Sequence, residues 1–528
     1  MQWAAGAVEE SLRLLGCSYP GKMPWCLFTL LSAAVIQGFH TIFPRLFLGW
    51  CKRKPSKVEL LRIRLRSRLA YVYWFTRGKL QPFLLNLHSM NVAEKYAPTL
   101  ELAQVYSEHS MGMIVLGCFR RAIACVAKSF EIRRSLGDLW GQGQSLSFHG
   151  VVLYAASRYN EAIEKCREAV RLLERTGDCW EMHIARYQIA ASLYRLGDLS
   201  GALEEARRMH WSAMELGEEQ ASGISLDIWA LATGGRVPEK ILAEEAARHR
   251  YDAQGKLQVL LAQGIQWMAD QRYEAAVLTL ERAVQEGRRL GLANAYTAPA
   301  LPWLATALRC QAENREELTP GPRAELLRRA ERIARCAVRI ARRLTNDLPH
   351  ALRELALIRA MQGKTRSVRR LLDESLAVAL RQQARYEYAQ TLEVCGRLGQ
   401  ELGWPGADRQ ASRAQSLLHR LRLPKRDDGC DPVAKPATLS LVDRFDTVLA
   451  SGHRIASALS AYVVYETSCE AAIRLLRAEQ CLVIEVDSET QPSELIPVVG
   501  NTEGEFDETV VRSALDAGRV IIPDGNGA

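Results

Sequence analysis

The chain has 528 residues, a formal net charge of +9 and thirteen cysteines. The cysteines are scattered, without a CxxC pair or a close His/Cys cluster, which argues against a disulfide framework and a structural zinc site and favours a reducing cytoplasm. The positive charge comes from arginine interleaved with glutamate, the pattern of solvated helix faces, so we expect no nucleic-acid partner. Ala, Leu, Arg and Glu dominate the middle of the chain, which predicts a mostly helical protein.

Residues 1–58 are predicted to form an apolar helical segment. The segment from Trp25 to Phe43 carries no formal charge and is just long enough to cross a bilayer. The basic segment "CKRK" at 51–54 would suit a cytoplasmic flank of such a span. Gln37 and His40 near its middle oppose a membrane span. We therefore expect a helix buried against the following repeats, while a membrane contact through residues 25–43 stays open as an alternative.

Residues 59–423 contain an internal repeat. Three segments align without a gap and step by 40 residues, and a fourth keeps the same internal spacing. In each, a small alanine allows two helices to approach closely, and a glycine ends the second helix in a left-handed conformation. These repeat-packing positions are Ala122, Ala162, Ala202 and Ala276 for the alanine, and Gly137, Gly177, Gly217 and Gly291 for the glycine.

Each repeat is predicted to be a helix, a short turn and a second helix, with an apolar face that only its neighbours can bury. Residues 60–95 are predicted to form a first helical pair. Residues 219–252 form a degenerate unit broken by "TGGRVPEK", and residues 321–344 form one arginine-rich helix. The sequence therefore predicts an α-solenoid with a period of about 40 residues.

The tripeptide Gly363-Lys364-Thr365 matches the end of a phosphate-binding loop. That loop also needs a glycine where Ile358 stands and a buried strand before it, whereas the preceding residues have the spacing of an amphipathic helix. We interpret Gly363 as part of a turn between two helices, and predict no nucleotide or other cofactor.

Residues 424–440 are rich in proline and charge and are predicted to be a linker. Residues 441–528 change character, with one long helix followed by strands at 480–487, around "ELIPVVG" and at 519–523, and a helix around "DETVVRSALDAG". This order predicts a small α/β domain.

The repeat, with small residues at Gly150 and Ala190 on the first helix and at Ala162 and Ala202 on the second, resembles a lengthened tetratricopeptide repeat. The segments "RIASALSAYVVYETSCEAAIRLL", "CLVIEVD" and "SALDAGRVIIPD" resemble the first half of a GAF sensory domain, and the chain stops before the strands that would complete it.

The order of these parts, with "SRLAYVYWFTRGKL", "GDLWGQGQSLSFHGVVLYAASRY" and "IARYQIAASLYRLGD", is similar to the middle of large bacterial signalling ATPase/kinase proteins. In that family a kinase and an ATPase precede the repeats and an output module follows the GAF domain. The motifs of the kinase and of the ATPase are absent from this sequence.

The resemblance implies a non-catalytic regulatory or scaffold chain in signal transduction, located in the cytoplasm. The expected partner is a protein or peptide, or an adjoining kinase/ATPase domain. We expect Tyr154, Tyr187, Tyr194 and Arg195, on first helices, to line the concave face and contact that partner; the alternative for each aromatic is a place wedged between helices.

No acid/base pair, nucleophile or metal set stands out, since Cys179 and His183 would supply at most two of the four ligands of a structural zinc. We therefore predict neither a catalytic nor a metal site. Two further alternatives stay open. In the first, the chain is an inactive fragment of a multidomain Ser/Thr kinase-ATPase sensor. In the second, it is a membrane-anchored repeat scaffold.

Overall fold

The computed structural model describes residues 2–17, 23–76, 80–250, 253–289, 294–314, 320–421, 441–456, 458, 460–476, 480–487, 494–500 and 506–517. The chain divides into two compact units, Met1–Asp431 and Pro432–Ala528. The expected linker 424–440 lies outside the described residues.

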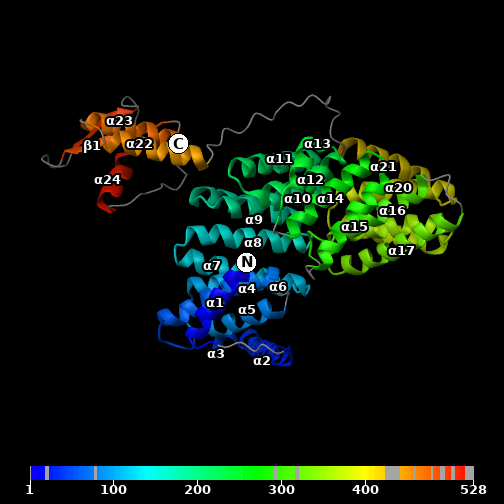
Figure 1. The fold of residues 1–528 in the computed structure, drawn as a ribbon, viewed down its shortest axis with the longest axis horizontal. Helices are drawn as coiled ribbons and strands as arrows, with labels where there is room; N and C mark the ends of the chain where they lie inside the picture. The colour runs from blue at the N-terminus through cyan, green and yellow to red at the C-terminus, as the bar shows by residue number, and fades with distance from the viewer. Residues whose placement is uncertain are drawn as a thin grey trace. The chain divides into compact units, whose positions relative to one another are not determined.

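The first unit is a solenoid of helical hairpins stacked in chain order (Figure 1). From Phe119 to Glu239 a new helix begins every 20 residues, which reproduces the 40-residue period of the sequence. The hairpins are α4 (Lys57–Thr76) with α5 (Leu80–Ala93), α6 (Leu100–Val115) with α7 (Phe119–Ser135), α8 (Leu139–Ala155) with α9 (Tyr159–Thr176), α10 (Cys179–Leu196) with α11 (Leu199–Glu215), α12 (Glu219–Thr233) with α13 (Glu239–Ala247), α14 (Ala253–Ala269) with α15 (Tyr273–Arg289), α16 (Ala300–Asn314) with α17 (Pro320–Ala341), α18 (Leu348–Met361) with α19 (Val368–Arg381), and α20 (Arg385–Glu401) with α21 (Ala407–Leu421).

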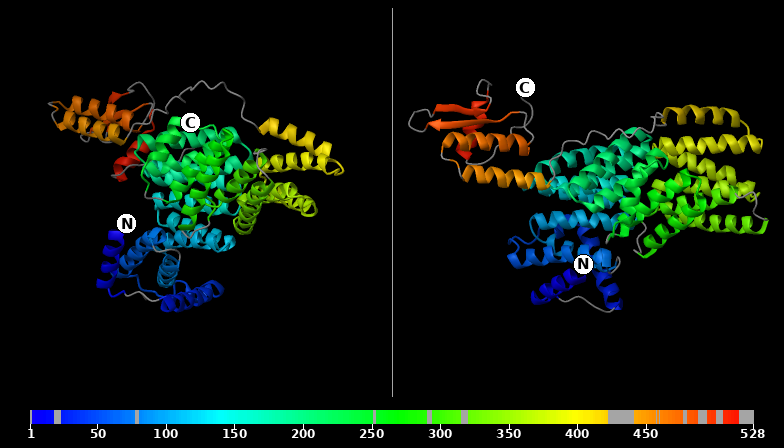
Figure 2. Two further views of the ribbon diagram at one scale, coloured as in Figure 1. Left: turned by 45° about the vertical axis from the view of Figure 1, so that its right-hand side comes forward. Right: turned by 45° about the horizontal axis from the view of Figure 1, so that its top comes forward.

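The hairpins form two layers of helices. Each first helix contacts the first helix of the next hairpin, from α4 through α20, and these helices make the inner layer. The second helices lie outside them, and two other orientations show the same stacking (Figure 2). One continuous apolar core runs from Met113 to Leu398 between the layers. The fold is therefore a tetratricopeptide-like α-solenoid, as the repeat pattern predicts.

The turns between helices use a glycine followed by an aspartate. Gly177, with φ of 75°, ends α9 in the left-handed region, and Asp178 then accepts a hydrogen bond of 3.0 Å from the backbone N–H of Glu181 at the start of α10. The same pair occurs at 137–138 and 197–198. An aspartate cap contributes about 1 kcal/mol to helix stability, so two adjacent residues end one helix and begin the next.

Small residues set the distance between the helices of a hairpin. A Cβ atom added at Gly150 on α8 would lie 2.0 Å from the Sγ atom of Cys166 on α9. Cys166 itself is fully buried, so the two backbones approach as closely as the missing Cβ allows. The landmark alanines Ala122, Ala162, Ala202 and Ala276 are likewise fully buried, and Gly137, Gly177 and Gly217 have positive φ, whereas Gly291 lies outside the described residues.

The phosphate-loop-like tripeptide lies in the turn after α18. Gly363 has φ of 72°, and Lys364 Nζ forms an ion pair of 2.9 Å with Glu331 of α17. Thr365 begins the short 3-10 helix η2 (Thr365–Ser367). The lysine is thus bound to a neighbouring hairpin, in agreement with the interpretation of this motif as a turn.

The N-terminal helices cover the first hairpin. Helix α1 (Gln2–Leu14) packs on α4, and α2 (Met23–Ile42), followed by α3 (Pro44–Phe47), packs on α5. The expectation that residues 25–43 form a buried helix is wrong in one respect. The face of α2 that packs on the repeats carries Cys26, Ala33, Gln37 and His40, while most of its large apolar side chains are exposed.

The second unit contains α22 (Leu441–Ala456), α23 (Ala461–Leu476), β1 (Leu482–Asp487), β2 (Glu494–Gly500) and α24 (Glu508–Ala517). The two strands are antiparallel, with Leu482 opposite Gly500 and Asp487 opposite Glu494. The single long helix expected over 442–479 is wrong, because α22 and α23 are separate. The strand expected at 519–523 lies outside the described residues, and the described sheet has two strands only.

Replacing Gly150 by alanine tests the close approach of α8 and α9. We expect Gly150→Ala to lower the free energy of unfolding by about 1–3 kcal/mol, because the new methyl group overlaps Cys166 in a filled core. Urea unfolding followed by circular dichroism measures this. Adding Cys166→Ala removes the overlapping sulfur and should recover much of the loss.

The matched control is Gly38→Ala in α2, where an added Cβ meets no atom within 4 Å. There the better helix propensity of alanine should leave stability unchanged or raise it by up to ~1 kcal/mol. Equal stability of Gly150→Ala and the unmodified chain would contradict the proposed role of the small residue.

Candidate functional site

The inner layer of the solenoid closes on itself. Helix α10 contacts α20, about ten helices further along the chain, and we call this contact the seam. The short 3-10 helix η1 (Thr345–Asp347) belongs to it. The seam consists of Tyr154, Ser157, Asn160, Tyr194 and Arg195 on one side and Tyr296, Thr345, Asn346, Asp347, Gln382, Gln383 and Tyr386 on the other.

A buried ion pair lies at the centre of the seam. Arg195 Nη2 lies 2.6 Å from Asp347 Oδ1, and their side chains are only 4% and 6% exposed. Arg195 Nη1 also donates a hydrogen bond of 3.0 Å to the backbone carbonyl of Asn346. Because removal of either charge would leave the other buried without a counter-ion, the pair makes the two halves of the array interdependent.

The predicted partner-binding tyrosines are also enclosed. Tyr154 stacks on Tyr296 with ring centroids 6.0 Å apart, and Tyr187 meets the same ring edge-on at 5.7 Å. Tyr194 meets Tyr386 edge-on at 5.9 Å. The four predicted residues, Tyr154, Tyr187, Tyr194 and Arg195, are all buried. The structure thus corrects the expectation that these four side chains line an open concave face: curvature of the array brings other inner helices onto them.

Two strained turns lie at the seam. Ser157 and Gln383 occupy left-handed turn positions, with φ of 60° and 56°, where most other turns of the array carry glycine. Gln271, with φ of 58°, is a further exception and is not part of the seam. The Ser157 hydroxyl lies 2.9 Å from that of Thr345, and Gln383 accepts a hydrogen bond of 2.6 Å from Asn160. The sequence did not predict this contact, because the turn at Gln271 also lacks glycine and the absence of glycine does not by itself identify the seam.

A buried polar cluster lies beside the seam. Tyr187 on α10 donates a hydrogen bond of 2.9 Å to Asp227 on α12, and Gln258 on α14 donates to the same carboxylate oxygen at 2.9 Å. Burial raises the pKa of Asp227 to about 7, although hydrogen bonds from Gln258 and Tyr187 oppose the shift. Three successive first helices therefore share one carboxyl group.

Further along the inner layer, charges pair between neighbouring first helices. Arg309 on α16 contacts Glu354 on α18 at 2.7 Å, and Arg353 on α18 contacts Glu387 on α20 at 2.6 Å, all four being largely buried. These four charged side chains thus bind one another and are not available to a partner, whereas more open surfaces lie elsewhere in the array.

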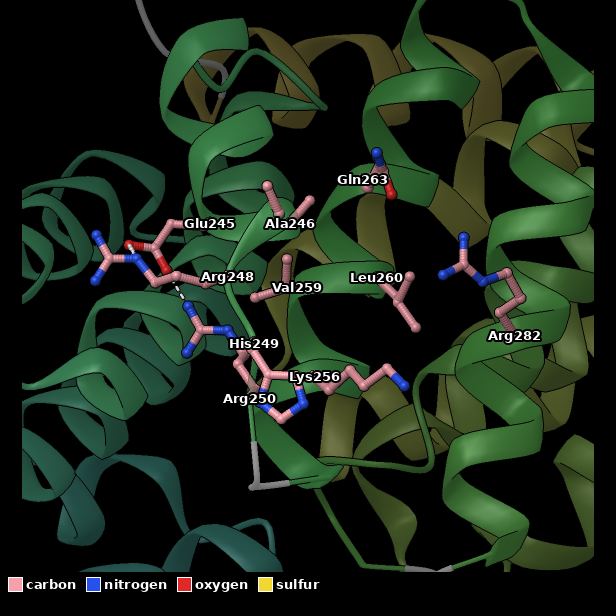
Figure 3. A pocket seen from close by; sticks show the side chains of 11 residues that line it. Glu245, Ala246, Arg248, His249, Arg250, Lys256, Val259, Leu260, Gln263 and Arg282 are labelled. Atoms are coloured by element: carbon pink, nitrogen blue, oxygen red, sulfur yellow. Dashed lines mark hydrogen bonds and ion pairs between the residues drawn. The ribbon is translucent and has the colours of Figure 1, made fainter.

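One such surface is a cavity of about 510 Å³ where the repeat is degenerate. Helix α13 has 9 residues whereas α15 has 17. Gly234, with φ of 65°, ends α12, and Pro238 precedes α13, which begins in register with the repeat but ends early at Ala247. The shortened outer helix leaves parts of α14 and α15 uncovered, and the end of α13 forms the opposite wall (Figure 3).

Basic side chains surround this cavity. Its lining comprises Glu245, Ala246, Ala247, Arg248, His249, Arg250, Lys256, Val259, Leu260, Gln263 and Arg282. Four permanently charged cations thus face one carboxylate. Glu245 is buried and pairs with Arg250 and, at 3.5 Å, with Arg248, and Lys256 pairs with Glu286 at 2.7 Å.

Arg282 lies on the wall of the cavity that α15 forms, across from the end of α13 (Figure 3). It is exposed on α15, and its guanidinium points toward Leu260 (Figure 3). No carboxylate among the described residues lies within ion-pairing distance of it. Val259 and Leu260 are buried and give the cavity an apolar floor. This arrangement suits a ligand with both negative charge and apolar groups.

A second cavity of about 600 Å³ lies at the edge of the seam, between α9, α10 and α20, with Arg167, Arg171 and Arg385 among its lining residues. Glu164 and Asp198 also line it, so its charge is more nearly balanced. Among the described residues no group of three or more His, Cys, Asp or Glu side chains could hold a metal ion. His183, named above with Cys179, instead contacts Glu218 at 2.6 Å and Ser212 at 3.0 Å.

No protein-family profile and no curated protein match the chain. Among solved structures it is similar to the Rap protein complexed with Competence and Sporulation Factor, at 12% identity and a TM-score of 0.41 over 80% of this chain and 98% of that chain. It is also similar to the human IFIT1 dimer with m7Gppp-AAAA, at 13% identity and a TM-score of 0.39 over 85% and 91%, and to the P58(IPK) TPR domain, at 15% identity and a TM-score of 0.24 over 80% and 96%. Each of these TM-scores is below 0.5.

Replacing Arg195 by methionine tests the seam. We expect Arg195→Met to lower the free energy of unfolding by about 3–5 kcal/mol, because Asp347 is left buried without its counter-ion. Urea unfolding measures the loss. The matched control is Arg208→Met, which breaks a surface pair with Glu204 in which the arginine is 44% exposed and should cost less than about 1 kcal/mol. Equal effects of the two substitutions would contradict the role of the seam.

The buried Asp227 carboxyl makes stability depend on pH. Its pKa is about 7 in the folded chain and about 3.9 in an unfolded one, so the folded state binds the proton more tightly and its contribution to stability falls as the pH rises from 4 to 7. Asp227→Asn cannot ionise. We expect its stability relative to the unmodified chain to increase by roughly 2–4 kcal/mol between pH 4.5 and 7.5, measured by urea unfolding at both pH values. The control Asp270→Asn alters an exposed carboxylate, and a pH-independent difference for Asp227→Asn would refute the prediction.

Proposed function

We propose that the chain is a non-catalytic scaffold of signal transduction, and that its repeat array holds a protein partner through an acidic, partly apolar segment. The observation that carries this proposal is the basic cavity at the end of α13, where Arg248, Arg250, Lys256 and Arg282 surround an apolar floor. The degenerate hairpin thus gives the solenoid a recessed basic site, whereas the cavity at the edge of the seam has a more nearly balanced charge.

The chemistry of the lining favours a peptide over a nucleic acid. Single-stranded nucleic acids bind where aromatic side chains stack on the bases along a basic groove. The lining of the cavity includes no Phe, Tyr or Trp, and its floor is aliphatic. Acidic side chains of a partner would approach Arg282 and Lys256, and a neighbouring apolar side chain would cover Val259 and Leu260.

The place of this scaffold in signalling rests on the resemblance of the chain to the middle of bacterial ATPase/kinase proteins. In that view the cytoplasmic array transmits a signal between an adjoining kinase or ATPase and residues 441–528, which would be part of a GAF-like sensory domain. The competing candidate is a regulatory fragment of one such enzyme. An immunoblot of source cells with antibody to residues 59–423 separates them: a band near 59 kDa favours an adaptor, and a much larger one favours the enzyme.

Charge reversal in the cavity tests the peptide site. The probe is a fluorescent ten-residue peptide of alternating Glu and Leu, and its binding to the full chain is followed by anisotropy. We expect Lys256→Glu with Arg282→Glu to weaken binding at least about tenfold, because two attractive contacts become repulsive. Binding to the unmodified chain should also weaken as salt is raised.

The matched control is Arg328→Glu, which reverses an arginine that is 67% exposed on α17, outside the cavity. It should leave the affinity within about twofold, since a distant surface charge is screened. Equal loss in both variants would show non-specific attraction to a basic protein. Tighter binding of an oligonucleotide than of the peptide would refute the proposed partner class.

A further inference from the structure

We propose that α2 and α3 bind the surface of a bilayer containing anionic phospholipids, with α2 lying in the plane of the membrane. This inference does not depend on the peptide site, because α2 and α3 lie at the N-terminal end of the array and the cavity lies within it. Helix α2 has an inverted arrangement, because its polar side chains Gln37 and His40 face the protein and most of its large apolar side chains face solvent.

The outer face of α2 and the residues after it form a continuous apolar surface. Phe28, Leu31 and Val35 are 64%, 66% and 53% exposed, and Phe39 and Ile42 continue the same face at 49% and 68%. Positions spaced by three and four residues lie on one side of a helix, so these side chains form a single stripe. The other strongly exposed apolar residues of this segment are Trp25, Leu27, Ile36, Phe43, Leu46 and Trp50.

The opposite face of α2 is held by a buried polar network. Gln37 donates hydrogen bonds to Glu94 at 2.7 Å and to Asn91 at 3.1 Å, and His40 Nδ1 lies 2.7 Å from the same Glu94 carboxylate. Tyr106 donates to the other oxygen of Glu94 at 2.7 Å. These groups are all buried, so they specify which face of α2 turns toward the array.

This network decides between lying on a bilayer and crossing it. The window Trp25–Ile42 is long and apolar enough to span a membrane. A spanning helix would carry Gln37 and His40 into hydrocarbon and would remove their hydrogen bonds to Glu94, and both changes are unfavourable. A helix lying in the interface keeps the network intact and inserts only its outer stripe.

The charges around this surface select the membrane as its occupant. Between residues 11 and 58 the sequence has no acidic residue. Arg45, Lys52, Lys54 and Lys57 are exposed, and no carboxylate among the described residues lies within ion-pairing distance of them. Basic residues beside an apolar stripe attract anionic headgroups. Trp25 and Trp50, at the two ends of the segment, are the residues that favour the boundary between lipid and water.

A second copy of the chain fits this surface less well. A two-fold interface brings the same patch of both subunits together. The basic residues next to the stripe would then face their own copies without acidic partners, which opposes association. An anionic bilayer supplies the missing negative charge as well as an apolar environment for the stripe.

The test is sedimentation of the full chain with vesicles of phosphatidylcholine containing roughly 30% phosphatidylglycerol. We expect the chain to bind these vesicles, to bind pure phosphatidylcholine at least about tenfold more weakly, and to be released by an alkaline carbonate wash. The triple variant Phe28→Glu, Leu31→Glu, Phe39→Glu should lose binding at least about tenfold, because charges replace the stripe. Lys52→Glu, Lys54→Glu, Lys57→Glu should lose the preference for anionic vesicles.

The matched control is Leu278→Glu with Leu380→Glu, on α15 and α19, where the leucines are 64% and 68% exposed. It should bind vesicles as the unmodified chain does. Three results would overturn the proposal. They are absence of binding to anionic vesicles, equal losses in the control and the triple variant, and retention in the carbonate pellet, which would indicate a spanning helix. A dimer in sedimentation velocity that the triple variant converts to a monomer, without vesicle binding, would assign the surface to a second copy.

Discussion

A helical hairpin has an apolar face that it cannot cover by itself, and the whole of the first unit follows from that constraint. Each hairpin covers its neighbour, and Gly150 against Cys166 shows how closely the paired backbones must approach for this packing. Since every interface adds a small rotation, the stack curves. The curvature brings α10 against α20, and the polar side chains at this contact become buried and must find partners within the array.

At the seam these partners come from distant parts of the same array. The inner face of an open solenoid is commonly available to a partner, but here Arg195 is neutralised by Asp347 and the inner tyrosines stack on one another. Positive φ at Ser157 and Gln383 is tolerated because both side chains form hydrogen bonds at this contact. Because these inner side chains bind one another, the more open surfaces of the array lie where the repeat is irregular.

Those places are the degenerate hairpin and the N-terminal end. At the hairpin, a shortened α13 leaves a basic cavity with an apolar floor. At the N-terminal end of the stack α2 packs on α5 with its polar face inward. Its apolar face is left outside, where a soluble protein ordinarily places charge. Both proposed binding surfaces thus lie where the repeat is interrupted, one inside the array and one at its N-terminal end.

The sequence by itself determined the hairpins, their period and their turns, because these depend on interactions within a few residues. A glycine followed by an aspartate ends one helix and begins the next, and small residues recur wherever two helices must touch. It also excluded a phosphate-binding loop at Gly363. The sequence showed through Gln37 and His40 which side of α2 is polar, but it did not show that Glu94 is their partner.

Only the tertiary structure decided that Tyr154, Tyr187, Tyr194 and Arg195 are enclosed. Arg195 and Asp347 are 152 residues apart in the sequence, and no local pattern links them. Their contact depends on the rotation accumulated over the hairpins between them, which is set by the packing of each interface and not by the composition of any one repeat. The sequence therefore specified the unit of the array, and the summed geometry of its interfaces decided which surfaces stay open.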